Sequence, residues 1–208
     1  MDDLIKIINK LKKSEVLNII NARIKEFAAF KEESIQIIFR EMCFCIMTAN
    51  CGAEKCIEIH NRMKDDFLIL DRIQLAEKFK ECGYRFPNIR SGYIIEARDY
   101  ITDLEKILNQ NNQDGSLRDW IVKNIKGLGY KEASHFLRNV GYENYAIIDF
   151  HIIDVLVKYK LIEKPKTLTK KKYIEIEYIL KEMGEKLKLS LAELDLYLWY
   201  LETGKVLK

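Results

Sequence analysis

The stretch Ile125-Lys126-Gly127-Leu128-Gly129-Tyr130-Lys131 decides the fold of this chain. Residues 116–140 around it have the pattern of a helix, a tight hairpin and a second helix. Gly127 and Gly129 permit positive φ and a close approach of the backbone. The unpaired N–H groups at the start of the following helix can then bind a phosphate. The alternative interpretation is an ordinary helical corner that ends in a glycine cap.

Lys131 falls in the first turn of the second helix, where its charge opposes the helix dipole. This placement is poor for stability, but the positive field favours the uncharged amine, which is the nucleophilic form. Attack of that amine on a sugar carbon that carries a base would expel the base. The resulting imine would let the 3′ phosphate leave by β-elimination. Taken alone, an exposed lysine at a helix start is the simpler interpretation.

Asp149 follows the apolar run 146–148 and precedes a helix predicted near 150–159. Its simplest role is that of an N-cap. A carboxylate at this place could also stabilise a cationic sugar or help to move a proton. His151 is a candidate phosphate contact, and a partly buried helix histidine is the alternative.

Helical periodicity dominates the chain, strand alternation is almost absent, and an all-α fold is therefore predicted. Helices are expected at 4–11, 16–24, 35–48 and near 53–65, 71–82, 91–109, 116–124, 131–140, 150–159, 169–183 and 191–203. Ser116 with Asp119 and Ser190 with Glu193 have the spacing of capping boxes. Residues 111–115 are predicted to form an exposed turn.

The amino-acid composition excludes several classes of protein. The 208 residues are 48% hydrophobic, and 35 basic against 32 acidic residues give a net charge of only +3. A basic patch for a nucleic acid can still exist, because binding depends on local charge. The five cysteines form no Cys-x-x-Cys pair, so no zinc or iron–sulfur site and no metal is expected. No apolar run is long enough for a membrane and no export signal is visible, which predicts a cytoplasmic, nucleoid-associated protein.

The hairpin segment through Lys131-Glu132-Ala133, together with Ile148-Asp149-Phe150-His151, resembles the signature of the helix-hairpin-helix DNA glycosylase superfamily. The resemblance implies that Lys131 is the nucleophile and Asp149 the essential acid. It also implies two helical halves that flank a DNA-binding cleft. We expect one glycosylase unit over 1–208, with one half at roughly 30–145 that holds the hairpin at 116–140, and a second half formed by 1–29 and 146–208.

A narrower resemblance is to the archaeal-type 8-oxoguanine DNA glycosylase/AP lyases, carried by residues 84–90, residues 131–139 and the C-terminal end. It implies a bifunctional enzyme that excises 8-oxoguanine by Schiff-base chemistry and β-elimination. Phe86, Trp199 and the terminal Lys208 are then candidates for the base pocket. Asn50, in the loop 48–51, is the candidate wedge, the residue that fills the gap left by the extruded base. Core packing for Trp199, disorder for the tail and a turn role for Asn50 are the alternatives.

The implied partner is double-stranded DNA containing 8-oxoguanine, bound by a monomer without a membrane. No cofactor is required, although the resemblance implies a monovalent cation on hairpin carbonyls such as those of Ile125 and Leu128. Three alternatives stay open. The first is a glycosylase for another oxidised base or for mispaired adenine, the second is a non-enzymatic helix-hairpin-helix protein that only grips DNA, and the third is a helical interaction protein.

Overall fold

The computed structural model describes residues 1–110 and 115–208, and every regular element in those ranges is helical. Thirteen α-helices and one short 3₁₀ helix follow one another along this part of the chain. The all-α prediction is confirmed. Of the predicted turn at 111–115, only Gly115 lies within the described residues. Among the helices that are described, none is both long enough and apolar enough to cross a membrane.

The chain divides into two compact units. One, the terminal unit, combines Met1–Lys31 with Leu137–Lys208, and the other, the central unit, is Glu32–Phe136. The sequence placed residues 137–145 in the half that holds the hairpin, whereas the structure groups them with the chain ends. The boundary therefore falls inside helix α10 (Tyr130–Asn139) rather than after it.

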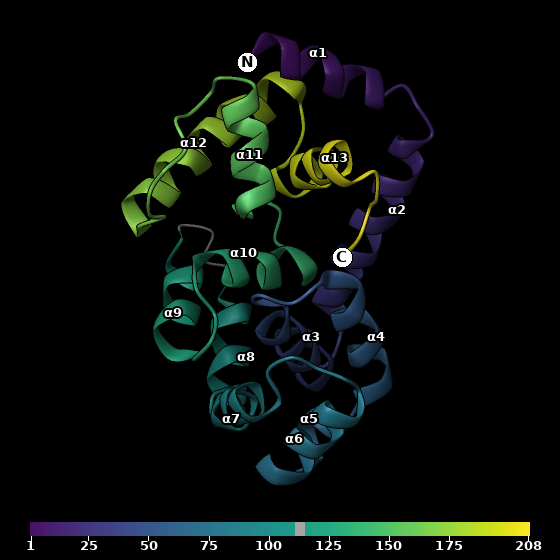
Figure 1. Cartoon of the computed structure of the whole chain (residues 1–208), viewed down its shortest axis with the longest axis vertical. Coiled ribbons are helices and arrows are strands. Elements are labelled where there is room, and N and C mark those ends of the chain that lie inside the picture. The colour runs from purple at the N-terminus through teal and green to yellow at the C-terminus, as the bar shows by residue number, and fades with distance from the viewer. Residues whose placement is uncertain (111–114) are drawn as a thin grey trace. The chain divides into compact units, whose positions relative to one another are not determined.

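The central unit is built around α3 (Ile35–Thr48), whose residues are all buried from Glu41 to Thr48. A helix that is apolar on nearly all sides belongs in a core, and α3 packs against α4, α5, α7 and α8 (Figure 1). The other elements of this unit are η1 (Phe30–Glu32, at the boundary), α4 (Ala53–Met63), α5 (Asp66–Ile69), α6 (Arg72–Glu81), α7 (Pro87–Arg98), α8 (Ile101–Asn109) and α9 (Ser116–Asn124).

In the terminal unit, α13 (Leu191–Thr203) is the helix on which the others pack. It contacts α1 (Asp2–Leu11), α2 (Val16–Ala29), α11 (Phe150–Lys158) and α12 (Lys170–Leu187) (Figure 1). The predicted capping box at its start is confirmed: the Ser190 hydroxyl accepts from the Glu193 N–H, and the Glu193 carboxylate accepts from the Ser190 N–H. Two N–H groups at the helix start are thereby satisfied.

Two local predictions are wrong. The expected helix at 91–109 is two helices, because the chain turns at Asp99 and Tyr100 between α7 and α8. Helix α7 also begins earlier, at Pro87, since proline is tolerated in a first helical turn where no N–H is needed. Ser116 is not the N-cap that the sequence predicted: Gly115, with φ of 88°, is the N-cap of α9, and Ser116 is the first residue of the helix.

Candidate active site

The hairpin between α9 and α10 is held by its own backbone. The Ile125 N–H donates to the Ile121 carbonyl at 2.8 Å, and the Leu128 N–H donates to the Ile125 carbonyl at 3.2 Å. Gly127 lies between them with φ of 91°. Gly129 does not have positive φ, so only Gly127 adopts the conformation that the sequence permits at both glycines.

Gly127 is also the point where the hairpin approaches α7. A Cβ atom at this position would lie 2.5 Å from Tyr93 Cδ2 and 3.3 Å from Arg90 Nη1. Real Cβ atoms do not approach a ring carbon so closely, so only glycine lets the two segments meet. The neighbouring Lys126 lies over the same Tyr93 ring, 5.5 Å from its centroid, and pairs with Glu96 at 3.3 Å.

Lys131 lies in the first turn of α10, as the sequence predicts. Its side chain is 25% exposed, and its Nζ is 3.8 Å from a Glu132 carboxylate oxygen. The positive charge of Lys131 acts electrostatically on the buried thiol of Cys56. Burial raises the pKa of Cys56 far above its ordinary value and a hydrogen bond with Cys51 raises it further, whereas the charges of Lys131 and Arg90 lower it.

The candidate wedge Asn50 is exposed in the loop that follows α3. Its φ of 62° is unusual for a residue other than glycine, although asparagine tolerates it better than most. The preceding Ala49 is the C-cap of α3, and its carbonyl accepts a hydrogen bond from Arg90 Nη2 at 3.1 Å. The same guanidinium lies 5.8 Å from the ring centroid of Phe86, a candidate pocket residue.

Asp149 is the N-cap of α11, and its Oδ1 accepts from the Ile152 N–H at 3.0 Å. The extended segment before it is buried and hydrogen-bonded to α12. The Tyr173 hydroxyl donates to the Ala146 carbonyl at 2.7 Å and accepts from the Ile148 N–H at 3.1 Å. Glu177 accepts from the Ala146 N–H at 2.9 Å. These contacts fix the backbone that places Asp149.

Sequence reasoning missed Tyr173 and Glu177. The signal was present but weak: Glu177 comes one residue after the buried Ile176, on a helix whose buried face also carries Tyr173. A carboxylate beside an apolar face usually needs a hydrogen-bond donor, but the sequence does not say which donor it finds.

His151 and Trp199 lie together in the terminal unit. Their ring centroids are 4.7 Å apart in an edge-to-face arrangement. The ring of His151 also contacts that of Phe150, with 4.0 Å between the two centroids. Trp199 is only partly buried, so it is not a plain core residue. An aromatic cluster therefore adjoins the helix start that carries Asp149.

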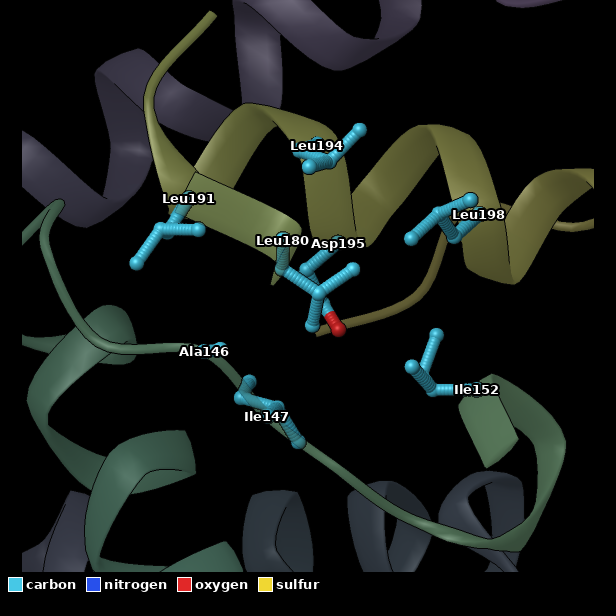
Figure 2. A pocket seen from close by; sticks show the side chains of 8 residues that line it. All are labelled: Ala146, Ile147, Ile152, Leu180, Leu191, Leu194, Asp195 and Leu198. Carbon is cyan, nitrogen blue, oxygen red and sulfur yellow. The ribbon is translucent and has the colours of Figure 1, made fainter. Parts of the chain in front are cut away.

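A small hollow in the terminal unit lies beside the same extended segment (Figure 2). Its volume of about 10 Å³ is room for about one water molecule and excludes a purine. Asp195 is the one charged side chain on its wall, and its carboxylate pairs with the buried Arg138. The lining residues are Ala146, Ile147, Ile152, Leu180, Leu191, Leu194, Asp195 and Leu198. This hollow is a packing feature rather than a base pocket.

The C-terminal tail follows a helix stop at Gly204, whose φ is 71°. Val206, Leu207 and Lys208 are each partly buried, so the tail packs on the protein. The Lys205 N–H donates to the Thr203 hydroxyl at 3.3 Å, which ties the first tail residue to α13.

The structure thus gathers the predicted residues into two sets. The central unit holds Asn50, Phe86, Gly127, Gly129 and Lys131, and the terminal unit holds Asp149, His151, Trp199 and Lys208. Within residues 1–110 and 115–208, no group of three or more His, Cys, Asp or Glu side chains is arranged to hold a metal ion.

Comparison with known proteins identifies the class to which this fold and these residues belong. Residues 20–189 match the model of the 8-oxoguanine DNA glycosylase family with the helix-hairpin-helix motif. The 8-oxoguanine DNA glycosylase/AP lyase of Methanocaldococcus jannaschii is 51% identical over 99% of both chains. The enzyme of the same name from Korarchaeum cryptofilum is 47% identical over 100% of this chain and 99% of its own.

Solved structures agree with the sequence match. The crystal structure of the Methanocaldococcus jannaschii enzyme in complex with 15mer DNA containing 8-oxoguanine has a TM-score of 0.95 and covers 99% of both chains. That of the 8-oxoguanine DNA glycosylase of Thermotoga maritima has a TM-score of 0.93 at 37% identity and covers 100% of this chain and 99% of that one. The chain belongs to the 8-oxoguanine DNA glycosylase family.

The packing at Gly127 predicts the effect of a methyl group there. Gly127→Ala should lower the free energy of unfolding by about 1–3 kcal/mol, because the new Cβ meets the Tyr93 ring. Gly129→Ala is the matched control, since its Cβ would lie 3.4 Å from a flexible Glu132 oxygen. Its loss should be about 0.5 kcal/mol, from the slightly poorer helix cap. Chemical denaturation measures both free energies of unfolding. Equal losses in the two variants would contradict the conclusion that the approach to Tyr93 requires glycine at residue 127.

Proposed function

We propose that this chain is a bifunctional DNA glycosylase/AP lyase that excises 8-oxoguanine from double-stranded DNA and acts as a monomer. The observation that carries the proposal is the relationship, at 51% identity over 99% of both chains, to an enzyme of that name. The lysine in the first turn of α10, directly after the hairpin, supports the same chemistry.

Lys131 is the nucleophile in this proposal. Its uncharged amine attacks C1′ of the damaged nucleotide, the bond from C1′ to the base breaks, and the base leaves with a proton. Opening of the sugar ring then gives an imine between C1′ and Nζ. The imine makes the C2′ proton acidic, and loss of that proton expels the 3′ phosphate. The partial exposure of Lys131 supports this role, because the amine must reach a sugar.

Asp149 is the acid that assists the first step. Its carboxylate stabilises positive charge that develops on the sugar, or carries a proton between amine and base. The buried segment that precedes it supports this role, because the hydrogen bonds to Tyr173 and Glu177 fix the point from which the side chain projects. One oxygen of the carboxylate caps α11, and the other is left for the substrate.

The remaining candidate residues bind different parts of the DNA. The N–H groups at the hairpin and at the start of α10 contact a DNA phosphate, and His151 contacts another. Phe86 and Trp199 offer flat faces to the extruded base, and Asn50 fills its place in the stack. The Ile125 carbonyl accepts one hydrogen bond, from Leu128, and keeps a lone pair for a monovalent cation, which would support the phosphate contact.

Lys131→Gln should abolish covalent trapping by borohydride on duplexes that contain 8-oxoguanine, because glutamine cannot form an imine. Binding to the same duplex should persist, since the hairpin backbone is unchanged. Lys126→Gln is the control, because this exposed lysine lies in the same hairpin but pairs with Glu96. Trapping that survives in Lys131→Gln would reject the nucleophile. Trapping by the parent on other lesions but not on 8-oxoguanine would reject the substrate, and trapping on none would indicate a protein that only grips DNA.

Asp149→Asn separates charge from helix capping. Asparagine keeps an oxygen for the Ile152 N–H and caps helices as well as aspartate, so thermal stability should be unchanged. Base excision measured in a single turnover should slow about a hundredfold or more, because the charge is lost. Excision at the parent rate by a folded Asp149→Asn protein would show that another group supplies the acid.

Lys208 is tested by two variants that separate its side chain from the terminal carboxylate. Lys208→Ala keeps the carboxylate in place, whereas deletion of Lys208 moves it back by one residue. If the side chain contacts the base, both should reduce the preference for 8-oxoguanine over other lesions, with little change in melting temperature. A loss in the deletion alone would assign the contact to the carboxylate. An unchanged preference in both would remove the tail from the site.

A further inference from the structure

Arg90 is a buried cation that the proposed chemistry does not use. It lies on α7 and is only 9% exposed. Its Nε is buried and makes no hydrogen bond within the described residues. A buried arginine with an unused donor costs stability, so its presence calls for a role that a smaller side chain would not fill.

The guanidinium contacts three separate parts of the candidate site. Nη2 donates to the Ala49 carbonyl at 3.1 Å, directly before the wedge Asn50. Nη1 lies 3.3 Å from the position of a Cβ on Gly127, at the hairpin. The ring centroids of Tyr93 and Phe86 are 5.4 and 5.8 Å from its central carbon. One side chain therefore joins the wedge loop (residues 48–51), the hairpin and a pocket residue, all within the central unit.

Electrostatics explain how this charge is tolerated. Ala49 is the C-cap of the 14-residue helix α3, whose carbonyl end carries partial negative charge. The Tyr84 hydroxyl donates to the Met47 carbonyl at 2.7 Å, so two side chains hold the last carbonyls of the same helix. Burial raises the pKa of Tyr84, and the charge of Arg90 lowers it. The end of α3, from which the wedge loop begins, is thus fixed by side chains of another segment.

We propose that Arg90 is a positioning residue that holds Asn50 at a fixed distance from the hairpin, so that phosphate contact and base replacement occur together. The inference rests on the proposed function. It follows that Arg90 matters where a base must be extruded and its gap filled. It matters much less at a preformed abasic site, where no base remains to be extruded and Lys131 can react directly with the sugar.

The test compares these two substrates. Arg90→Met removes the donor and keeps an apolar stem of similar length. Excision of 8-oxoguanine in a single turnover should fall by about tenfold or more, because a misplaced group near the reacting centre is costly. Borohydride trapping on a duplex with a preformed abasic site should stay close to that of the parent. Arg90→Lys, which keeps the charge and a donor group but not the planar guanidinium, should restore part of the excision rate.

Arg98→Met is the matched control. Arg98 lies on the same helix and also donates to a backbone carbonyl, that of Phe67, at 2.9 Å. It holds α5 rather than the wedge loop. Its loss should lower the melting temperature while the ratio of excision to trapping stays that of the parent. A selective loss of excision in Arg98→Met would show that general destabilisation explains the Arg90 result, and would overturn the inference.

A double-mutant cycle completes the experiment. If Arg90 acts through Asn50, excision by Asn50→Ala with Arg90→Met should be no slower than by Asn50→Ala alone, because coupled residues are not additive. Additive losses, equal losses of excision and trapping in Arg90→Met, or parental excision by Arg90→Met would each overturn the inference. A parent protein that neither excises nor traps would instead refute the proposed function, and the two failures are therefore distinguishable.

Discussion

The central unit depends on one close approach, that of the Gly127 backbone to the Tyr93 ring. With no side chain at residue 127, the hairpin lies against α7 and its positive φ turns the chain into α10. The start of α10 then carries Lys131. The same approach brings the hairpin to Arg90, whose guanidinium holds the carbonyl of Ala49. The proposed nucleophile, the proposed phosphate contact and the wedge loop are thus linked through one packing contact.

The terminal unit obtains a fixed carboxylate in a different way. The extended segment 145–148, directly before Asp149, is neither helix nor sheet. Its buried N–H and carbonyl groups therefore need hydrogen-bond partners from other parts of the chain. Tyr173 and Glu177 of α12 supply them one and three residues before the cap of α11. The side chain of Asp149 then caps α11, because its Oδ1 accepts a hydrogen bond from the Ile152 N–H. Rigidity of the backbone therefore comes from a helix far away in the sequence.

The sequence was most informative where a feature is local. The hairpin, the lysine in the next helical turn, the N-cap at Asp149 and the capping box at Ser190 each depend on a few neighbouring residues, and the structure contains all of them. The break between α7 and α8 was missed because the apolar face formed by Ile94, Ala97 and Leu104 continues through it. Periodicity alone does not distinguish one long helix from two in register.

Features that arise from tertiary contacts were not predictable. Gly127 and Gly129 look alike in the sequence, but only the first has positive φ and a close approach to Tyr93 in the structure. Arg90 has the appearance of a surface arginine in a polar helix, whereas the structure buries it against the end of α3. Tyr173 lies 24 residues beyond Asp149 in the chain, and nothing in the intervening sequence indicates that its hydroxyl meets the segment before that residue.

The arrangement of the terminal unit has a consequence for biosynthesis. Its helices α1 and α2 are synthesised before the central unit but pack on α13, which is synthesised after that unit. The continuous central unit is complete long before that and can fold while synthesis proceeds. Helices α1 and α2 therefore keep an uncovered apolar side until α13 has been synthesised. A nascent chain that lacks α13 would therefore contain a central unit that can fold and a terminal unit without the helix on which its other helices pack.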